Sequence, residues 1–380
     1  MQVMKLDQLE TPCLLLDESR LERNVARMRA HLDSLGVNLR LHVKTAKSID
    51  VVRRVLRSPQ DPITVSTLKE AEYFLANGVQ NILYAVGMTP NKLEHVTDLR
   101  RRGAGLALIL DSVEAAHAVA AHARSRADRI PVLIEIDCDG HRSGMLPGDP
   151  ALIEAGRVLA DGGCELRGVM THAGGSYNCT TVAAIKAMAL QERDAVLNAA
   201  KALRTAELPC PVVSVGSTPT ATCAGNLTGV TEVRAGVFVF FDLVMAGLQV
   251  CTLDDIALSV LASVIGHQRE KGWIIVDAGW MAMSRDRGSA KQKIDQGYGL
   301  VCNAQGEPYP DLIMTDANQE HGVIALRQGA RAALPDLPLG TLLRILPNHA
   351  CATGAQHQAY QVVREGSDTV GATWPRFAGW

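Results

Sequence analysis

The sequence predicts an α/β protein in which a (β/α)8 barrel of the TIM type is joined to a second, mainly β domain. Between residues 39 and 240, short runs rich in Val, Ile and Leu alternate with helix-like segments. Eight such runs fit into about 200 residues, the usual content of a barrel of this type. After Leu248 the chain changes to strand-like runs separated by Gly and Pro, with little helix. A doubly wound open sheet is the main alternative for the first part.

The eight predicted barrel strands are short apolar runs. They span residues 39–44, 63–65, 82–86, 106–110, 132–137, 166–172, 212–216 and 232–240. Helices are expected at 112–126, 149–161 and 181–204, where apolar residues recur at spacings of three and four. The pairs Asp111-Ser112 and Ser66-Thr67 are typical helix starts, because their side chains can accept from free backbone N–H groups.

The second domain is expected to contain strands at residues 256–266, 272–278 and 342–346. Residues 13–17 are also strand-like and precede an amphipathic helix at 19–32, so we expect them to pair with this C-terminal domain. The predicted division is therefore a barrel of residues 18–245 and a β-rich domain of residues 1–17 and 246–380.

Composition narrows the classes of partner. The 380 residues are 47% hydrophobic, with a formal net charge of −2 and no basic stripe, so we expect a small-molecule substrate rather than nucleic acid or a membrane surface. The N-terminus lacks the apolar core of a secretory signal. Nine cysteines, an odd number without CxxC pairs, predict a reduced, cytoplasmic protein.

The segment Arg40-Leu-His42-Val-Lys44-Thr45 carries the first chemical signal. As a buried strand, it would place Arg40, His42 and Lys44 on one face, because successive side chains alternate. A buried ammonium group loses its solvation, and an amine kept neutral is a nucleophile that can form a Schiff base. Taken alone, Lys44 reads more simply as a surface lysine.

The polar ends of the other strands carry the second signal. In such barrels the active site lies at the carboxyl ends of the strands, and phosphate is commonly held after strands seven and eight. Gly216-Ser217-Thr218-Pro219-Thr220 and Arg234-Ala-Gly236-Val237 occupy those two places, although glycine after a strand is usually only a turn. A lysine near a phosphate anchor suggests pyridoxal phosphate. Further polar side chains expected at this mouth are Asp137, Arg142, His172 and Tyr177.

The third signal is Asn348-His349-Ala-Cys351, which follows an apolar run. If that strand continues, His349 and Cys351 face the same side and could bind one divalent metal. The alternative is a packed cysteine beside a hydrogen-bonded histidine, because two ligands do not define a metal site. The polar clusters Glu320-His321 and Asp277 with Ser284 and Asp286 are expected in loops near the site, without an assigned role.

Together these motifs resemble the fold-type III pyridoxal-phosphate enzymes with an alanine-racemase-like barrel. The similarity is greatest to the group of D-serine and D-threo-3-hydroxyaspartate dehydratases, with the D-threonine aldolases as a sister branch. It implies Lys44 as the Schiff-base lysine and catalytic roles for Arg142 and Tyr177. It also implies a divalent metal on His349 and Cys351. The cofactor-binding set that it implies is Lys44, His42, His172, Tyr177, Gly216, Ser217, Thr218, Gly236 and Val237.

Two positions depart from the family pattern, Leu41 in place of proline and Phe238 in place of tyrosine, the latter removing one hydroxyl contact to the cofactor. The residue type at position 351 distinguishes the dehydratases from the aldolases, and cysteine there indicates a dehydratase. The aldolase branch typically has aspartate there, which suits manganese or magnesium, whereas a thiolate favours zinc, with manganese, magnesium and cobalt as other candidates.

The resemblance therefore implies a lyase that eliminates water from a small D-β-hydroxy amino acid, D-threo-3-hydroxyaspartate or D-serine, to give a 2-oxo acid and ammonia. The alternatives are retro-aldol cleavage to glycine and an aldehyde, and a pyridoxal-phosphate-binding protein without turnover. The resemblance also implies a homodimer.

Overall fold

The computed structural model describes residues 4–380 and separates into two compact units. One comprises the described residues up to Arg27 together with Val237–Ala378, and the other comprises Met28–Gly236 with Gly379–Trp380. The boundary at Arg27 falls inside helix α1 (Glu18–Ser34). No helix within residues 4–380 is both long and apolar enough to cross a membrane.

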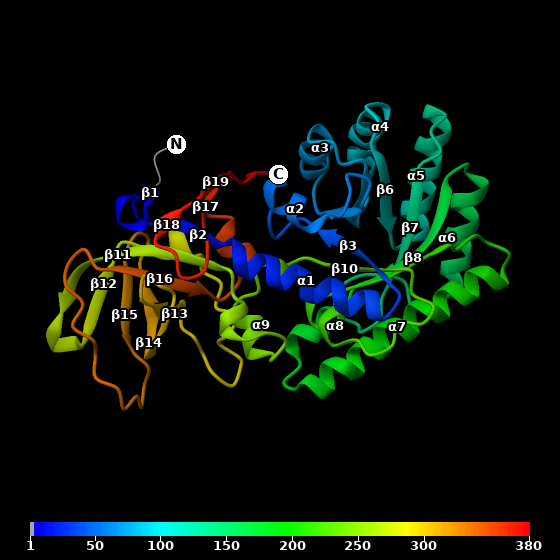
Figure 1. The fold of residues 1–380 in the computed structure, drawn as a ribbon. Coiled ribbons are helices and arrows are strands. Elements are labelled where there is room, and N and C mark those ends of the chain that lie inside the picture. Colours follow the sequence, from blue (N-terminus) through cyan, green and yellow to red (C-terminus); the bar gives the residue numbers. More distant parts are fainter. Residues whose placement is uncertain (1–3) are drawn as a thin grey trace. The chain divides into compact units, whose positions relative to one another are not determined.

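The second of these units contains a closed barrel of eight parallel strands in the order β10-β3-β4-β5-β6-β7-β8-β9 (Figure 1). The predicted barrel is thus confirmed, and the open-sheet alternative is wrong. The strands are β3 (Asn38–His42), β4 (Ile63–Val65), β5 (Asn81–Gly87), β6 (Gly105–Leu110), β7 (Pro131–Ile136), β8 (Glu165–Thr171), β9 (Val212–Val215) and β10 (Glu232–Ala235).

Two predicted strand ends are wrong. The first strand ends at His42 rather than at residue 44, because Val43 begins a tight turn in which its carbonyl accepts from the N–H of Lys47. The last strand ends at Ala235 rather than at residue 240, and a 3-10 turn, Val237–Val239, follows Gly236.

Helices cover the outside of the barrel strands (Figure 1). They are α2 (Ile49–Val55), α3 (Leu68–Ala76), α4 (Leu93–Arg101), α5 (Val113–Arg126), α6 (Pro150–Asp161), α7 (Val182–Thr205) and α8 (Thr218–Cys223). The expected caps are confirmed: Thr67 and Ser112 each accept a hydrogen bond from the backbone N–H three residues on, which satisfies a donor that the first helical turn leaves free.

The barrel interior combines an apolar cluster with a buried ion pair. Leu83, Ile109, Leu133 and Met170 pack together on one side. On another side Arg40, 9% exposed, lies with its Nε 2.8 Å from a carboxylate oxygen of Glu232. Burying one charge without the other would be costly, so the two strands that carry them, β3 and β10, are matched as neighbours.

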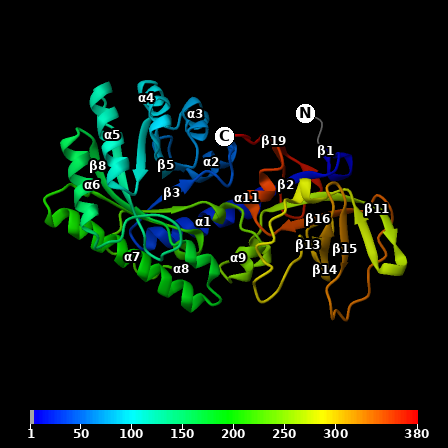
Figure 2. The same cartoon turned by 180° about the vertical axis from the view of Figure 1, so that it is seen from behind.

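The other unit is built on a nine-stranded sheet in the order β12-β15-β14-β13-β16-β11-β2-β17-β19 (Figure 2). The strands are β2 (Cys13–Asp17), β11 (Leu258–Gln268), β12 (Trp273–Val276), β13 (Gly299–Cys302), β14 (Pro308–Ala317), β15 (Gly322–Leu326), β16 (Leu342–Pro347), β17 (Ala359–Val363) and β19 (Ala372–Pro375). A separate pair is β1 (Met4–Lys5) with β18 (Thr369–Val370). Short helices are α9 (Leu243–Gly247), α10 (Trp280–Met283) and α11 (Ala350–Gly354).

The prediction for residues 13–17 is confirmed. Strand β2 pairs antiparallel with β11 and parallel with β17, so an N-terminal segment completes the sheet formed by the C-terminal part of the chain. Its leucines, Leu14, Leu15 and Leu16, are at most 1% exposed, which explains why the strand reads as a continuous apolar run.

Candidate active site

Lys44 lies immediately beyond the carboxyl end of β3, in the turn that follows, and its side chain is exposed. The prediction of a buried lysine on the strand is therefore wrong. The physical reason is the early end of the strand: Arg40 and His42 do share its inner face, but Lys44 has left the ladder and reaches the solvent-accessible mouth of the barrel.

Two histidines lie within electrostatic range of Lys44. Burial lowers the pKa of His42 well below its usual range, and the charge of Lys44 lowers it further. Burial also lowers the pKa of His172, to about 3, and Lys44, Arg234 and Arg142 contribute in the same direction. Both imidazoles are therefore neutral near pH 7. The charges that act on these two rings come from Lys44, Arg234 and Arg142, so these residues lie near one another at the barrel mouth.

His172 also joins two loops of this mouth. Its Nδ1 donates a hydrogen bond of 2.6 Å to the carbonyl oxygen of Gly216, which places the ring proton of the neutral form on Nδ1. Its ring centroid lies 6.4 Å from that of Tyr177, in the 3-10 turn Gly174–Asn178. The loops after β8 and β9 therefore meet through His172.

The loop after β9 has features suited to a phosphate group. Gly216 has φ +154°, and a Cβ there would overlap the carbonyl oxygen of Arg234, so the position requires glycine. Ser217 caps α8 by accepting from the N–H of Thr220. The buried hydroxyl of Thr218 has no hydrogen-bond partner among residues 4–380, and it is free to donate to an anion.

The second glycine of the predicted anchor is equally constrained. A Cβ at Gly236 would lie 2.6 Å from the carbonyl oxygen of His42, so only glycine allows β10 to approach the end of β3 this closely. The two glycines thus serve the close packing of the barrel strands. Val237 is buried at the start of the following 3-10 turn, and no contact assigns it to the mouth.

The sequence analysis missed Glu192, which supports both loops from below. It lies on α7, is 2% exposed, and its Oε1 accepts from the N–H groups of Ala173 and Gly216, each at 3.0 Å. Burial raises the pKa of this carboxyl group. The available signal was a glutamate within the buried face of α7, between Ala189 and Val196.

Arg142 lies in the loop after β7 with an exposed side chain. Its guanidinium is 3.6 Å from the carboxylate of Glu135, whose pKa is raised by burial and lowered by Arg142. An exposed arginine at the mouth can bind a substrate carboxylate. Asp137 instead stabilises its own loop by accepting from the N–H groups of Asp139 and Gly140.

His349 and Cys351 lie in the other unit. The prediction that they alternate on one strand is wrong: β16 ends at Pro347, His349 is the cap residue of α11, and Cys351 lies in its first turn. The two side chains nevertheless converge, since the His349 ring hydrogen bonds to Cys351. No cluster of three or more potential ligands occurs within residues 4–380, so a metal here would have two protein ligands from this chain.

Asp286 contacts His349 directly, a role the sequence analysis left open. Its Oδ2 lies 2.6 Å from Nδ1 of His349, and this hydrogen bond lowers the pKa of the Asp286 carboxyl group. The neighbouring clusters have other roles. Asp277 accepts from Thr11 and from the N–H of Ser263, and Glu320 and His321 are exposed.

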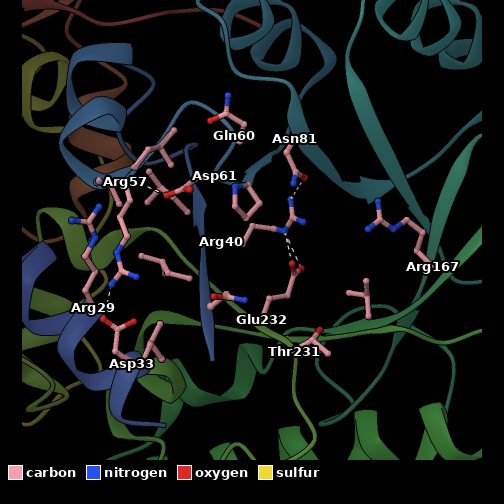
Figure 3. A pocket seen from close by; sticks show the side chains of 18 of the residues that line it. Arg29, Asp33, Arg40, Arg57, Gln60, Asp61, Asn81, Arg167, Thr231 and Glu232 are labelled. Atoms are coloured by element: carbon pink, nitrogen blue, oxygen red, sulfur yellow. Dashed lines mark hydrogen bonds and ion pairs between the residues drawn. The ribbon is translucent and has the colours of Figure 1, made fainter. Parts of the chain in front are cut away.

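A cavity of about 490 Å³ lies at the opposite, amino-terminal end of the barrel strands (Figure 3). It is lined by the first residues of β3, β5, β9 and β10, and none of the predicted site residues lines it. Arg40 occupies its centre, bound to Glu232 and to the side-chain oxygen of Asn81. Arg57 is likewise paired with Asp33. The ion pairs Arg40–Glu232 and Arg57–Asp33 thus neutralise much of the charge in the cavity lining.

Comparison with known proteins shows which families and relatives this chain resembles. The family described as "Alanine racemase, N-terminal domain" matches residues 16–244, and that described as "Putative serine dehydratase domain" matches residues 257–363. D-threo-3-hydroxyaspartate dehydratase of Delftia sp. (strain HT23) is 57% identical over 98% of both chains.

Solved structures agree. D-threo-3-hydroxyaspartate dehydratase from Delftia sp. HT23 superimposes with a TM-score of 0.95 at 56% identity, covering 99% of this chain and 100% of that one. A cysteine-to-alanine mutant of that dehydratase in the metal-free form gives the same TM-score, identity and coverage. This chain therefore belongs to the family in which an alanine racemase N-terminal domain is combined with a serine dehydratase domain.

Proposed function

We propose that this protein is a dehydratase of D-β-hydroxy amino acids, with D-threo-3-hydroxyaspartate as the first candidate substrate and D-serine as the second. The observation that carries the proposal is the 57% identity to the Delftia dehydratase over 98% of both chains. The reaction removes water from the substrate and, after hydrolysis, releases a 2-oxo acid and ammonia.

The cofactor of the proposal is pyridoxal 5'-phosphate. The unpaired hydroxyl of Thr218 and the loop at Gly216 and Ser217 are suited to its phosphate, with Gly236 and Val237 on the second loop. The neutral rings of His42 and His172, with Tyr177, form the polar mouth beside it. When bound, the cofactor supplies an electron sink for the pair left on the substrate Cα.

Lys44 has two roles in this proposal. Its Nζ would be the group that holds the cofactor through a Schiff base, and the same amine would be the base for the α-proton of the substrate. Exposure at the barrel mouth leaves Nζ accessible to both. Arg142 and Tyr177 are proposed to bind and orient the substrate, with the guanidinium of Arg142 on a carboxylate.

The metal of the proposal is a divalent ion on His349 and Cys351. A thiolate with an imidazole favours zinc, with manganese, magnesium and cobalt as alternatives. The existence of a metal-free form of a D-threo-3-hydroxyaspartate dehydratase mutant supports a metal in that relative. When bound, the ion would supply Lewis-acid chemistry that favours loss of the β-hydroxyl group as water.

The test is a substrate panel with the purified enzyme, pyridoxal phosphate and metal. D-threo-3-hydroxyaspartate, D-serine and D-threonine are compared, and ammonia and 2-oxo acid are measured. We expect equal amounts of the two from the first substrate, and none with a Lys44→Ala variant. Glycine with an aldehyde would establish the aldolase reaction instead, and no ammonia from any substrate would refute the proposal.

Two further expectations accompany this function. We propose that residues 18–245 bind the cofactor while residues 1–17 and 246–380 carry the metal. We also propose a cytoplasmic homodimer, for which light scattering of the purified protein is the direct measurement of mass.

A further inference from the structure

The candidate metal ligand His349 is held by a carboxylate on a separate segment. Asp286 follows α10 by three residues, and its Oδ2 lies 2.6 Å from Nδ1 of His349. The same ring hydrogen bonds to Cys351. The imidazole is therefore constrained by Asp286 and by Cys351 together.

The Asp286 carboxylate is itself fixed in place. Its Oδ1 accepts from the N–H of Gly288 at 2.8 Å, and its own N–H donates to Oγ of Ser284 at 3.2 Å. One carboxylate oxygen thus stabilises the loop, and the other is directed at His349. A carboxylate with both its backbone and one oxygen restrained can impose an orientation on its partner.

The backbone beside His349 is tied to the same segment. The amide of Asn348, 2% exposed, donates to the carbonyl oxygens of Gly297 at 2.7 Å and Asp286 at 3.3 Å. Its Oδ1 accepts from the fully buried Ser289 at 2.6 Å. The loop that carries Asp286 and the turn that carries the ligands therefore form one hydrogen-bonded unit.

A second carboxylate, which is buried, holds the residue between the two ligands. Asp242, 1% exposed, accepts from the N–H of Ala350 at 3.0 Å and from the N–H of Met245 at 3.0 Å. The backbone of the ligand turn is thus held by Asp242 and Asn348, which leaves the orientation of the imidazole to its side-chain partners Asp286 and Cys351.

We propose that Asp286 is a positioning residue for the metal. By accepting the Nδ1 proton of His349, it selects the tautomer whose Nε2 lone pair is available to the ion and sets the direction of that lone pair. With only two protein ligands, the orientation of each one determines affinity more strongly than in a site of four. This proposal rests on the proposed function, which assigns the metal to His349 and Cys351.

The test measures metal affinity rather than turnover. Metal-free protein is titrated with zinc against a chromophoric chelator, for the wild type and the variants Asp286→Asn and Asp286→Ala. We expect affinity to fall by about 10–100-fold in both. The matched control is Asp295→Asn, on the same segment, where the carboxylate pairs with Arg287 and accepts from the N–H of Gly297, a bond that the asparagine oxygen can also accept. The control is expected to bind zinc as the wild type does.

Cobalt(II) substitution reports the geometry independently, through the thiolate-to-cobalt absorption from Cys351. We expect an altered spectrum in the Asp286 variants and an unaltered one in the control. Because 33% of the Asp286 side chain is exposed, both substitutions are expected to fold, and thermal unfolding of the metal-free proteins checks this.

The outcomes separate this proposal from the proposed function. Wild-type zinc affinity and cobalt spectrum in folded Asp286→Asn or Asp286→Ala, with binding lost in His349→Ala, would overturn the positioning role and leave the metal pair intact. Wild-type zinc affinity in His349→Ala and Cys351→Ala would remove the metal pair, and the positioning role with it.

Discussion

Glu192 offers the sharpest test of how the barrel mouth is held together. Its single Oε1 accepts from the N–H groups of Ala173 and Gly216, which belong to the loops after β8 and β9. A Glu192→Ala substitution leaves both buried donors without their acceptor. Glu192→Gln retains an amide oxygen at the same distance from the helix and can still accept both bonds.

The magnitude follows from the two lost bonds. A buried donor left without a partner costs about 1–3 kcal/mol, so Glu192→Ala is expected to lose about 2–6 kcal/mol of unfolding free energy. For a unit of this size, that corresponds to a fall in Tm on the order of 5–20 °C. The Gln variant is expected to lose roughly 1 kcal/mol, because the charge-assisted part of each bond is removed.

The assay combines thermal unfolding with cofactor binding. Circular dichroism gives the Tm, and titration with pyridoxal phosphate, followed by its visible absorbance, reports on the Gly216 loop. Asp194→Ala is the matched control, since Asp194 lies on the same helix with 57% of its side chain exposed and pairs only with Arg193. A surface change of this kind is expected to stay within about 0.5 kcal/mol. If Glu192→Ala unfolds and binds cofactor as Asp194→Ala does, the two bonds do not support the mouth.

Three further predictions concern individual groups. Lys44→Ala should abolish the visible absorbance of bound cofactor, and a normal band in that variant would mean that another lysine holds it. Cys351→Ala should lose metal and activity while keeping the cofactor, measured by metal analysis and absorbance; full activity of metal-stripped wild type would make the cysteine structural. The pKa of His172 is about 3 in the folded protein and about 6.5 in an unfolded chain. As pH falls from 6.5 toward 3, the imidazole therefore takes up a proton in the unfolded chain but not in the folded one, and the free energy of unfolding decreases. Urea unfolding at about pH 7 and pH 5 should show that the free energy of unfolding depends less on pH in His172→Gln than in the wild type, by at most about 1.4 kcal/mol per pH unit. An equal pH dependence in the two proteins would contradict the shift in the pKa of His172.

The barrel was predictable because its elements are short, show a regular apolar pattern and are separated by recognisable turn and cap residues. Strands such as β4 and β6 are apolar runs that are almost entirely buried, and the hydroxyl caps Thr67 and Ser112 mark helix starts with a local hydrogen bond. The strands β13, β14, β15, β17 and β19 were not predicted. They belong to a mainly antiparallel sheet whose strand lengths are set by partners far away in sequence.

Errors at the candidate site share one cause. The alternation assumed for Lys44, and again for His349 and Cys351, continues a strand beyond the point where its partner stops pairing. Where a strand ends is decided by neighbouring strands and by turns such as the one closed by Lys47, so periodicity alone extends it too far.

Local sequence determined the kinds of element, the eight-strand barrel count and the residue types gathered for chemistry, because propensity, periodicity and capping act over a few neighbouring residues. Tertiary structure decided which buried charges neutralise one another, as in Arg40 with Glu232, and which carboxylates hold the loops, as with Glu192 and Asp286. Those partners lie tens to hundreds of positions apart, and only closing the barrel and folding the sheet bring them within hydrogen-bonding distance.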